Sequence, residues 1–239
     1  AADSRAKLLD VAGRYQSWPA IEHAIGQARS RAELELRQSG LSTVELERIQ
    51  TLLSALLYPQ PGLRAAPATL AANTRGQPAL WAYGISGDYP ILLVHIDAEE
   101  GLGVIQELLQ AHAYWRKRGL KIDLVILNQR QAGYNQELRD QIHRLLVKMQ
   151  SEAWLYQRGG IFMLHAGQLN EADRILLESA ARVALDADQT GLVVQLDALR
   201  RQAGQLPPFA PERPTVAEDE SPPPPVARPA GLIFDNGLG

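Results

Sequence analysis

Five histidines are the residues with which this chain could most readily carry out acid–base or metal chemistry: His23, His95, His112, His143 and His165. No two of them have the spacing that puts two metal ligands on one helix. His95 and His165 end two apolar runs that we expect to be parallel strands, so they could meet at the carboxyl edge, where open α/β sheets bind ligands. Asp97 could join them, although we expect it to cap the following helix. We favour packing or capping roles for these histidines.

Phosphate-binding and nucleophilic motifs are incomplete. Gly101-Leu-Gly103 follows an apolar run, but the position of the third fingerprint glycine is Gln106, so a dinucleotide interpretation fails. We interpret the two glycines as tolerated within a helix. There is no cysteine, no Walker sequence and no Gly-x-Ser-x-Gly elbow. The sequence therefore predicts no catalytic residue, no cofactor and no metal ligand.

The stretch 80–89 combines aromatic, polar and glycine residues. Apolar faces of sugars stack on aromatic rings, and carboxylates accept hydrogen bonds from hydroxyls, so the stretch supports a carbohydrate hypothesis. The alternative, which we favour, is that Trp81 anchors the segment onto the core and is mostly buried. We also expect two glycines with positive φ and a compact turn over 86–88. The candidate contact residues, for carbohydrate or for another domain, are Trp81, Tyr83, Ser86, Asp88 and Tyr89.

The elements that must position these residues form an α/β pattern. Pro90 opens an apolar run that is followed by a helical pattern and a second apolar run, as in a parallel βαβ unit. We predict a small parallel sheet of three or four strands with flanking helices. Three strands are expected at 91–96, 122–127 and 161–165. Residues 181–186 fit either a fourth strand, slightly favoured, or an extension of the preceding helix.

The chain divides by composition into five expected parts. Nine of its 15 prolines lie between Pro207 and Pro229, which is typical of an extended linker. The expected parts are a helical connector (1–58), an irregular connecting segment (59–89), a three-layer α/β module (90–205), a Pro-rich flexible linker (206–231) and the truncated start of a β-sandwich (232–239). The missing initiator Met and the abrupt end suggest a fragment of a longer polypeptide.

Composition excludes several partners. The 239 residues carry a formal net charge of −3, and the densest basic cluster, 116–118, lies at an expected helix end, where cations oppose the helix dipole. We therefore expect no nucleic-acid partner. No apolar run approaches the roughly 20 residues of a membrane span, so we expect none.

Several ordered stretches resemble a segment of bacterial cyclic β-1,2-glucan synthases. They are Asn73-Thr74-Arg75-Gly76-Gln77, the run from Leu80 to Ile91, Ala111-His112-Ala113-Tyr114-Trp115-Arg116, the run from Leu120 to Asn128, and the closing Phe234-Asp235-Asn236-Gly237-Leu238-Gly239. The resemblance implies very large inner-membrane proteins that join a UDP-glucose-dependent glycosyltransferase, a cyclising region and a glycoside-phosphorylase-like part. This chain resembles a stretch of that last part, just before a β-sandwich and an α/α barrel.

The resemblance transfers no catalytic residue. The phosphorylase-like general acid belongs to the barrel, and the transferase signature Gln-x-x-Arg-Trp is absent, because Trp115-Arg116 has the reverse order. It implies a non-catalytic connecting module on the cytoplasmic side of the inner membrane. Its expected partners are neighbouring domains of the same polypeptide and, as a further candidate, β-1,2-glucan. No cofactor is expected.

The alternative is a stand-alone flavodoxin-like enzyme or ligand-binding domain that uses the carboxyl edge of its strands. Surface character separates the two hypotheses. A connector should expose apolar residues on its N-terminal helices. An independent enzyme should have a closed pocket with convergent polar groups.

Overall fold

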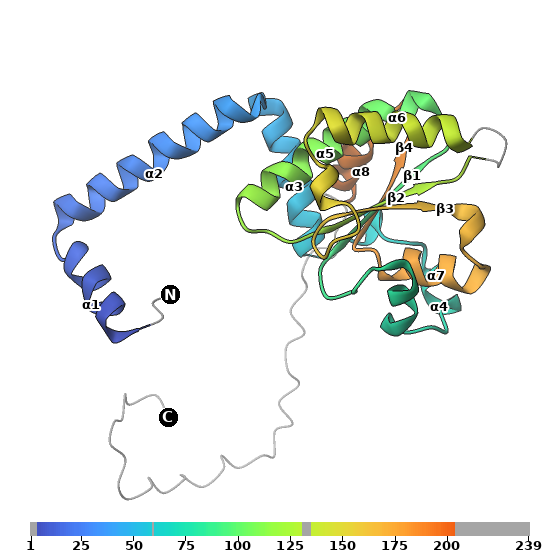
Figure 1. Ribbon diagram of the computed structural model, residues 1–239, viewed down its shortest axis with the longest axis horizontal. Helices are drawn as coiled ribbons and strands as arrows, with labels where there is room; N and C mark the ends of the chain where they lie inside the picture. The colour runs from blue at the N-terminus through green and yellow to red at the C-terminus, as the bar shows by residue number, and fades with distance from the viewer. Residues whose placement is uncertain (1–3, 59, 131–134, 204–239) are drawn as a thin grey trace, which may run out of the picture. The chain divides into compact units, whose positions relative to one another are not determined.

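The computed structural model describes residues 4–58, 60–130 and 135–203. Most of this part of the chain is an α/β unit built on one sheet (Figure 1). The expected linker at 206–231 and the expected β-sandwich start at 232–239 lie outside the described residues.

The sheet is entirely parallel, and its strands lie close to the predicted ranges. They are β1 (Ile91–Ile96), β2 (Asp123–Asn128), β3 (Ile161–His165) and β4 (Val183–Ala187). The order across the sheet is β3-β2-β1-β4. The fourth strand confirms the favoured interpretation of 181–186. The order is that of the dinucleotide-binding doubly wound fold rather than that of flavodoxin.

Two helical layers cover the sheet, because successive strand residues point to opposite faces. Leu92 and Val94 belong to a core with α3 (Thr43–Leu57), α5 (Leu102–Lys117), α6 (Asn135–Lys148) and α8 (Gly191–Ala203). Ile91 and Leu93 belong to a second core with η2 (Gln77–Tyr83) and α7 (Glu171–Ala180). Both layers are seen in Figure 1, with α4 (Pro67–Ala72) packed beside α7. Helices cover both faces, as predicted.

The segment 59–89 is more regular than expected. It contains η1 (Pro61–Leu63), α4 and η2, and each begins with a proline in its first turn. Proline fits there because the first helical N–H groups have no intrahelical partner. The prolines that interrupt the hydrophobic periodicity thus start short helices, and the expectation of an irregular segment was only partly right.

Two helices precede α3 in the N-terminal segment. They are α1 (Arg5–Arg14) and α2 (Trp18–Ser39), which ends at Gly40 in the left-handed conformation. A capping box between Ser42 and Glu45 starts α3. The inward face of α3 includes Leu52, whereas Leu57 is exposed. No helix in the described ranges is long and apolar enough to cross a membrane.

The start of α5 corrects the sequence interpretation. Asp97 does not cap α5, because a short helix, η3 (Glu99–Gly101), intervenes and α5 begins at Leu102. Gly101 is also more than a tolerated glycine. A Cβ at this position would lie 2.1 Å from the carbonyl oxygen of Ala187 at the end of β4. The close packing of η3 against β4 therefore requires glycine at position 101.

Candidate functional site at the amino edge of the sheet

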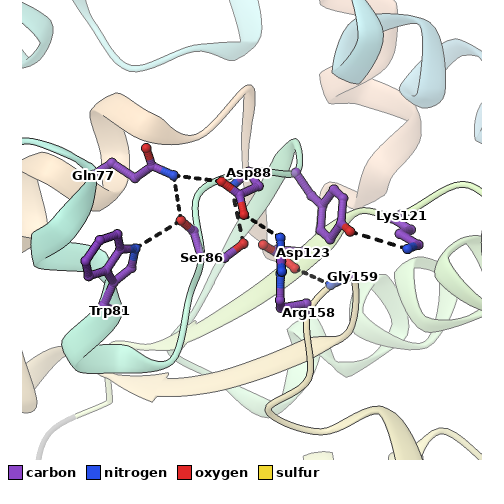
Figure 2. Close-up of polar contacts among 9 residues, drawn as sticks. Gln77, Trp81, Ser86, Asp88, Lys121, Asp123, Arg158 and Gly159 are labelled. Carbon is purple, nitrogen blue, oxygen red and sulfur yellow. Dashed lines mark hydrogen bonds and ion pairs between the residues drawn. The ribbon is translucent and has the colours of Figure 1, made fainter.

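The candidate site is formed by the chain segments that enter β1, β2 and β3. Parallel strands begin at the same edge of a sheet, so Asp88, Lys121 and Arg158 gather there although they are distant in sequence. Figure 2 shows these side chains together with Trp81 and Ser86. Four of the five predicted contact residues lie in this cluster, and Tyr83 is bound elsewhere.

The turn over 86–88 is compact, as predicted. Gly84 and Gly87 have φ values of +75° and +73°, which favour glycine. The Asp88 N–H donates to the Ser86 hydroxyl at 3.2 Å. The Gln77 side-chain amide donates to the Ser86 carbonyl at 2.7 Å and to the Asp88 carboxylate at 3.0 Å (Figure 2). These bonds hold the turn against η2.

Trp81 is exposed, which contradicts the predicted burial. Its side chain is 61% exposed, and its indole N–H donates to the Ser86 carbonyl at 3.2 Å (Figure 2). The reason is the three-residue period of η2. Leu80 and Tyr83 share one side and pack on the second core, so Trp81 faces outward.

Charged groups surround the turn. Asp88 and Arg158 form an ion pair, with side chains 50% and 60% exposed. The Arg158 guanidinium carbon and the Lys121 ammonium nitrogen lie 5.4 Å and 5.5 Å from the centre of the Tyr89 ring. These are cation–π distances. The pair is exposed enough for water to screen it, so it positions the side chains more than it stabilises the fold.

Two hollows open on this surface and share Asp88. One, of about 350 Å³, is lined by Trp81, Ser86 and Arg158 among others. The other, of about 510 Å³, includes Gln77 and Tyr89 in its lining. An aromatic ring, a carboxylate and a guanidinium group thus line one concave strip of surface.

Two buried ionisable side chains hold this edge of the sheet together through hydrogen bonds. Asp123 is fully buried, and its Oδ1 accepts a hydrogen bond from the Gly159 N–H at 2.7 Å. Burial raises the pKa of Asp123 to about 6. The His112 Nε2 donates to the carbonyls of Ile122 at 3.0 Å and Gly159 at 3.2 Å, and burial lowers the pKa of His112 to about 4. Both groups fix the turn that carries Arg158.

Tyr83 anchors η2 to α7. Its hydroxyl donates to Asp173 at 2.8 Å, and the same buried carboxylate accepts from Arg75 at 2.5 Å and from Asn170 at 2.7 Å. Burial and the neighbouring Asp173 raise the pKa of Tyr83. The anchoring role that we expected of Trp81 therefore belongs to Tyr83.

The carboxyl edge does not bring the two candidate histidines together. Strand β2 lies between β1 and β3, and His95 instead contacts Asp186 at 3.2 Å. His165 donates to the Arg130 carbonyl at 3.0 Å and accepts from the Gly167 N–H at 3.1 Å. Both histidines therefore have structural partners, as favoured. Within the described residues, no group of three His, Cys, Asp or Glu could hold a metal ion.

A cleft of about 460 Å³ lies at the carboxyl ends of β2 and β3, with Asn128 and His165 in its lining. The Asn128 side-chain oxygen accepts from the Arg130 N–H at 2.9 Å. The polar groups of both residues are thus bonded within the protein. The lining of the cleft also includes the polar side chains of Tyr83, Arg139, Tyr156 and Gln168.

The sequence interpretation missed four residues of the amino-edge site: Gln77, Lys121, Asp123 and Arg158. Arg158 lies 70 positions from Asp88, so no local pattern joins them. One signal was available. Each of Asp88, Lys121 and Arg158 just precedes an expected parallel strand, and such residues meet at one edge.

Comparison with known proteins shows one informative similarity. No protein-family model matches the chain. The chain is 34% identical over 139 residues to the cyclic β-(1,2)-glucan synthase NdvB of Rhizobium meliloti (strain 1021). The match covers 58% of this chain and 5% of that protein. The chain is therefore related to a short segment of a much longer synthase.

Proposed function

We propose that this chain is a non-catalytic connecting module of a polypeptide that makes cyclic β-1,2-glucan from UDP-glucose. The observation that carries the proposal is the 34% identity to NdvB over 139 residues. That segment is 5% of the relative's length, which is the proportion of a module rather than of a whole enzyme. Following the resemblance, we place the module in a larger membrane protein, on the cytoplasmic side of the bacterial inner membrane.

The exposed apolar residues of α1 and α2 support a connecting role. Seven large apolar side chains on or beside these helices are at least 43% exposed: Leu8, Leu9, Val11, Tyr15, Trp18, Ile25 and Leu34. Exposed apolar residues gathered on one part of a protein often mark a contact with a partner. We propose that neighbouring domains of the same polypeptide cover it. This is the surface property that we expected of a connector.

The ligand-binding alternative has less support. In the dinucleotide-binding fold, the phosphates lie at the switch point, which here falls between β1 and β4. There, Gly101 packs closely against the backbone of Ala187. At the other end of the carboxyl edge, Asn128 and His165 are bonded within the protein. The cleft of about 460 Å³ at that end is where the alternative would place its ligand.

Polar substitution of the N-terminal helices tests the connecting role. Leu9→Gln with Ile25→Gln, introduced into the glucan-synthesising polypeptide, should sharply lower the yield of cyclic β-1,2-glucan. The melting temperature of the 239-residue chain should stay unchanged, because both side chains are exposed. A matched control is Val193→Gln with Val194→Gln on α8, where the side chains are similarly exposed.

Two results would contradict the proposal. One is a normal glucan yield from the Leu9→Gln, Ile25→Gln variant. The other is micromolar binding of UDP-glucose to the 239-residue chain in calorimetric titration, since a connector has no donor-sugar site.

A further inference from the structure

We propose that the amino-edge surface around Trp81 binds a stretch of β-1,2-glucan chain. The identity of the sugar rests on the proposed function. The kind of ligand, an uncharged oligosaccharide, follows from the geometry of Trp81, Asp88 and Arg158 (Figure 2).

Trp81 is held so that its ring face is presented to solvent. Its indole N–H, the one polar group of the side chain, is already bonded to the Ser86 carbonyl at 3.2 Å. The ring is 61% exposed, so what it offers to a ligand is an apolar face in a fixed orientation. Sugar rings carry apolar C–H faces that stack on such rings, whereas a group that needs a hydrogen-bond donor gains nothing from this indole.

A polar pair, Asp88 and Arg158, lies beside the ring in the same hollow. Asp88 uses one carboxylate oxygen for Gln77 and the other for Arg158. A carboxylate has about four acceptor positions, so each oxygen retains capacity for a hydroxyl group. Arg158 is 60% exposed and has further N–H donors. Vicinal hydroxyls can donate to the carboxylate and accept from the guanidinium at the same time.

The size and charge of the surface also bear on the ligand. Two hollows, of about 350 and 510 Å³, both have Asp88 in their lining, and the first of them holds Trp81. In the hollow beside Trp81, the charge of Arg158 is balanced by Asp88. A neutral oligosaccharide therefore suits this hollow better than a sugar nucleotide. Because the turn is held by its own bonds, little ordering is needed on binding.

Calorimetric titration of the 239-residue chain with linear β-1,2-glucan oligosaccharides tests the inference. Wild type should bind, and Trp81→Ala should weaken binding by about tenfold or more, through loss of the stacking contact. Trp81→Phe should retain part of the affinity, because it keeps an aromatic face. Asp88→Asn should weaken binding through the hydroxyl contacts. Tyr58→Ala is the matched control, since Tyr58 is an exposed aromatic residue outside the strip.

Absence of binding to the wild-type chain, or equal binding by wild type and Trp81→Ala, would overturn the glucan site. Such a failure is distinct from failure of the connecting role. If the chain binds no glucan but substitution of Leu9 and Ile25 still abolishes synthesis, the connecting role stands and the glucan site falls.

Discussion

The indole N–H of Trp81 donates to the backbone carbonyl of Ser86 at 3.2 Å, which fixes an exposed ring over the turn that leads into β1. The same carbonyl accepts from Gln77 at 2.7 Å. A residue expected to anchor the segment in the core instead presents its ring at the surface. Substitution of Trp81 should therefore affect stability and ligand binding differently, and each effect can be measured on its own.

Truncation of Trp81 should cost little stability. Its ring is 61% exposed, so Trp81→Ala should change the free energy of unfolding by about 1 kcal/mol or less, mainly through the bond to Ser86. Trp115 is 1% exposed, and Trp115→Ala should cost about 3–5 kcal/mol. Denaturant melts of both variants check this pair. A loss of several kcal/mol for Trp81→Ala would mean that the ring is buried after all.

Alanine substitutions at two neighbouring glycines test the packing of η3 against β4. Gly101→Ala should destabilise the chain, because the new Cβ would lie 2.1 Å from a backbone oxygen of Ala187 and the strand cannot easily yield. We expect a loss of about 1–3 kcal/mol, the usual cost of overpacking. Gly103→Ala meets no atom within 4 Å and should stabilise α5 by up to about 1 kcal/mol. Equal effects in thermal melts would contradict the packing.

The anchor between η2 and α7 is tested by removing one hydroxyl. Tyr83→Phe deletes the 2.8 Å bond to the buried Asp173 and should cost about 0.5–1.5 kcal/mol of unfolding free energy. Tyr58→Phe, at a position 69% exposed, should have almost no effect. The prediction is wrong if the two substitutions are indistinguishable in denaturant titration.

The buried carboxyl of Asp123 predicts a pH dependence of defined sign. Its pKa is about 6 in the folded chain, against 3.8 for an ordinary aspartate, because burial disfavours the charged form. The folded state therefore holds the proton more tightly than the unfolded state. The destabilisation that ionised Asp123 causes is absent below the pKa of the unfolded chain. It grows as pH rises toward 6 and is constant above pH 6.

Asp123→Asn should therefore be more stable than wild type at pH 7–8, by on the order of 2 kcal/mol. The difference should shrink below pH 6 and vanish near pH 4. The pH dependence from His112 has the opposite sign. Burial lowers the pKa of His112 to about 4, so protonation of the unfolded chain makes the fold less stable as pH falls below 6.5. That contribution is common to both proteins, so their difference isolates Asp123. A pH-independent difference between them in denaturant melts would refute the assignment.

The sheet could be predicted from the sequence because its strands are covered on both faces. Leu92 and Leu93 lie in opposite cores, so the apolar run is continuous and plainly visible. Strand order could not be read, since all four strands have the same character. The cap at Asp97 was wrong because η3 inserts a short turn that has no periodic signal.

The candidate site was predicted only in part. The turn around Gly87 followed from local residue chemistry. The orientation of Trp81 depended on a seven-residue 3₁₀ helix, whose period cannot be recognised in so short a stretch. The pairing of Asp88 with Arg158 needed the sheet topology, and the buried bond from Gly159 to Asp123 depended on tertiary packing. Sequence therefore identified the loop but not its partners.

The most direct measurement of the central claim is cyclic β-1,2-glucan synthesis by NdvB in which the 139-residue matched segment is deleted or replaced by the corresponding residues of this chain. Cells lacking the native gene would carry each version at equal protein levels, and glucan would be quantified by mass spectrometry. The account predicts that deletion abolishes synthesis and that replacement restores most of it. Undiminished synthesis after deletion, or no synthesis after replacement by a correctly folded segment, would contradict it.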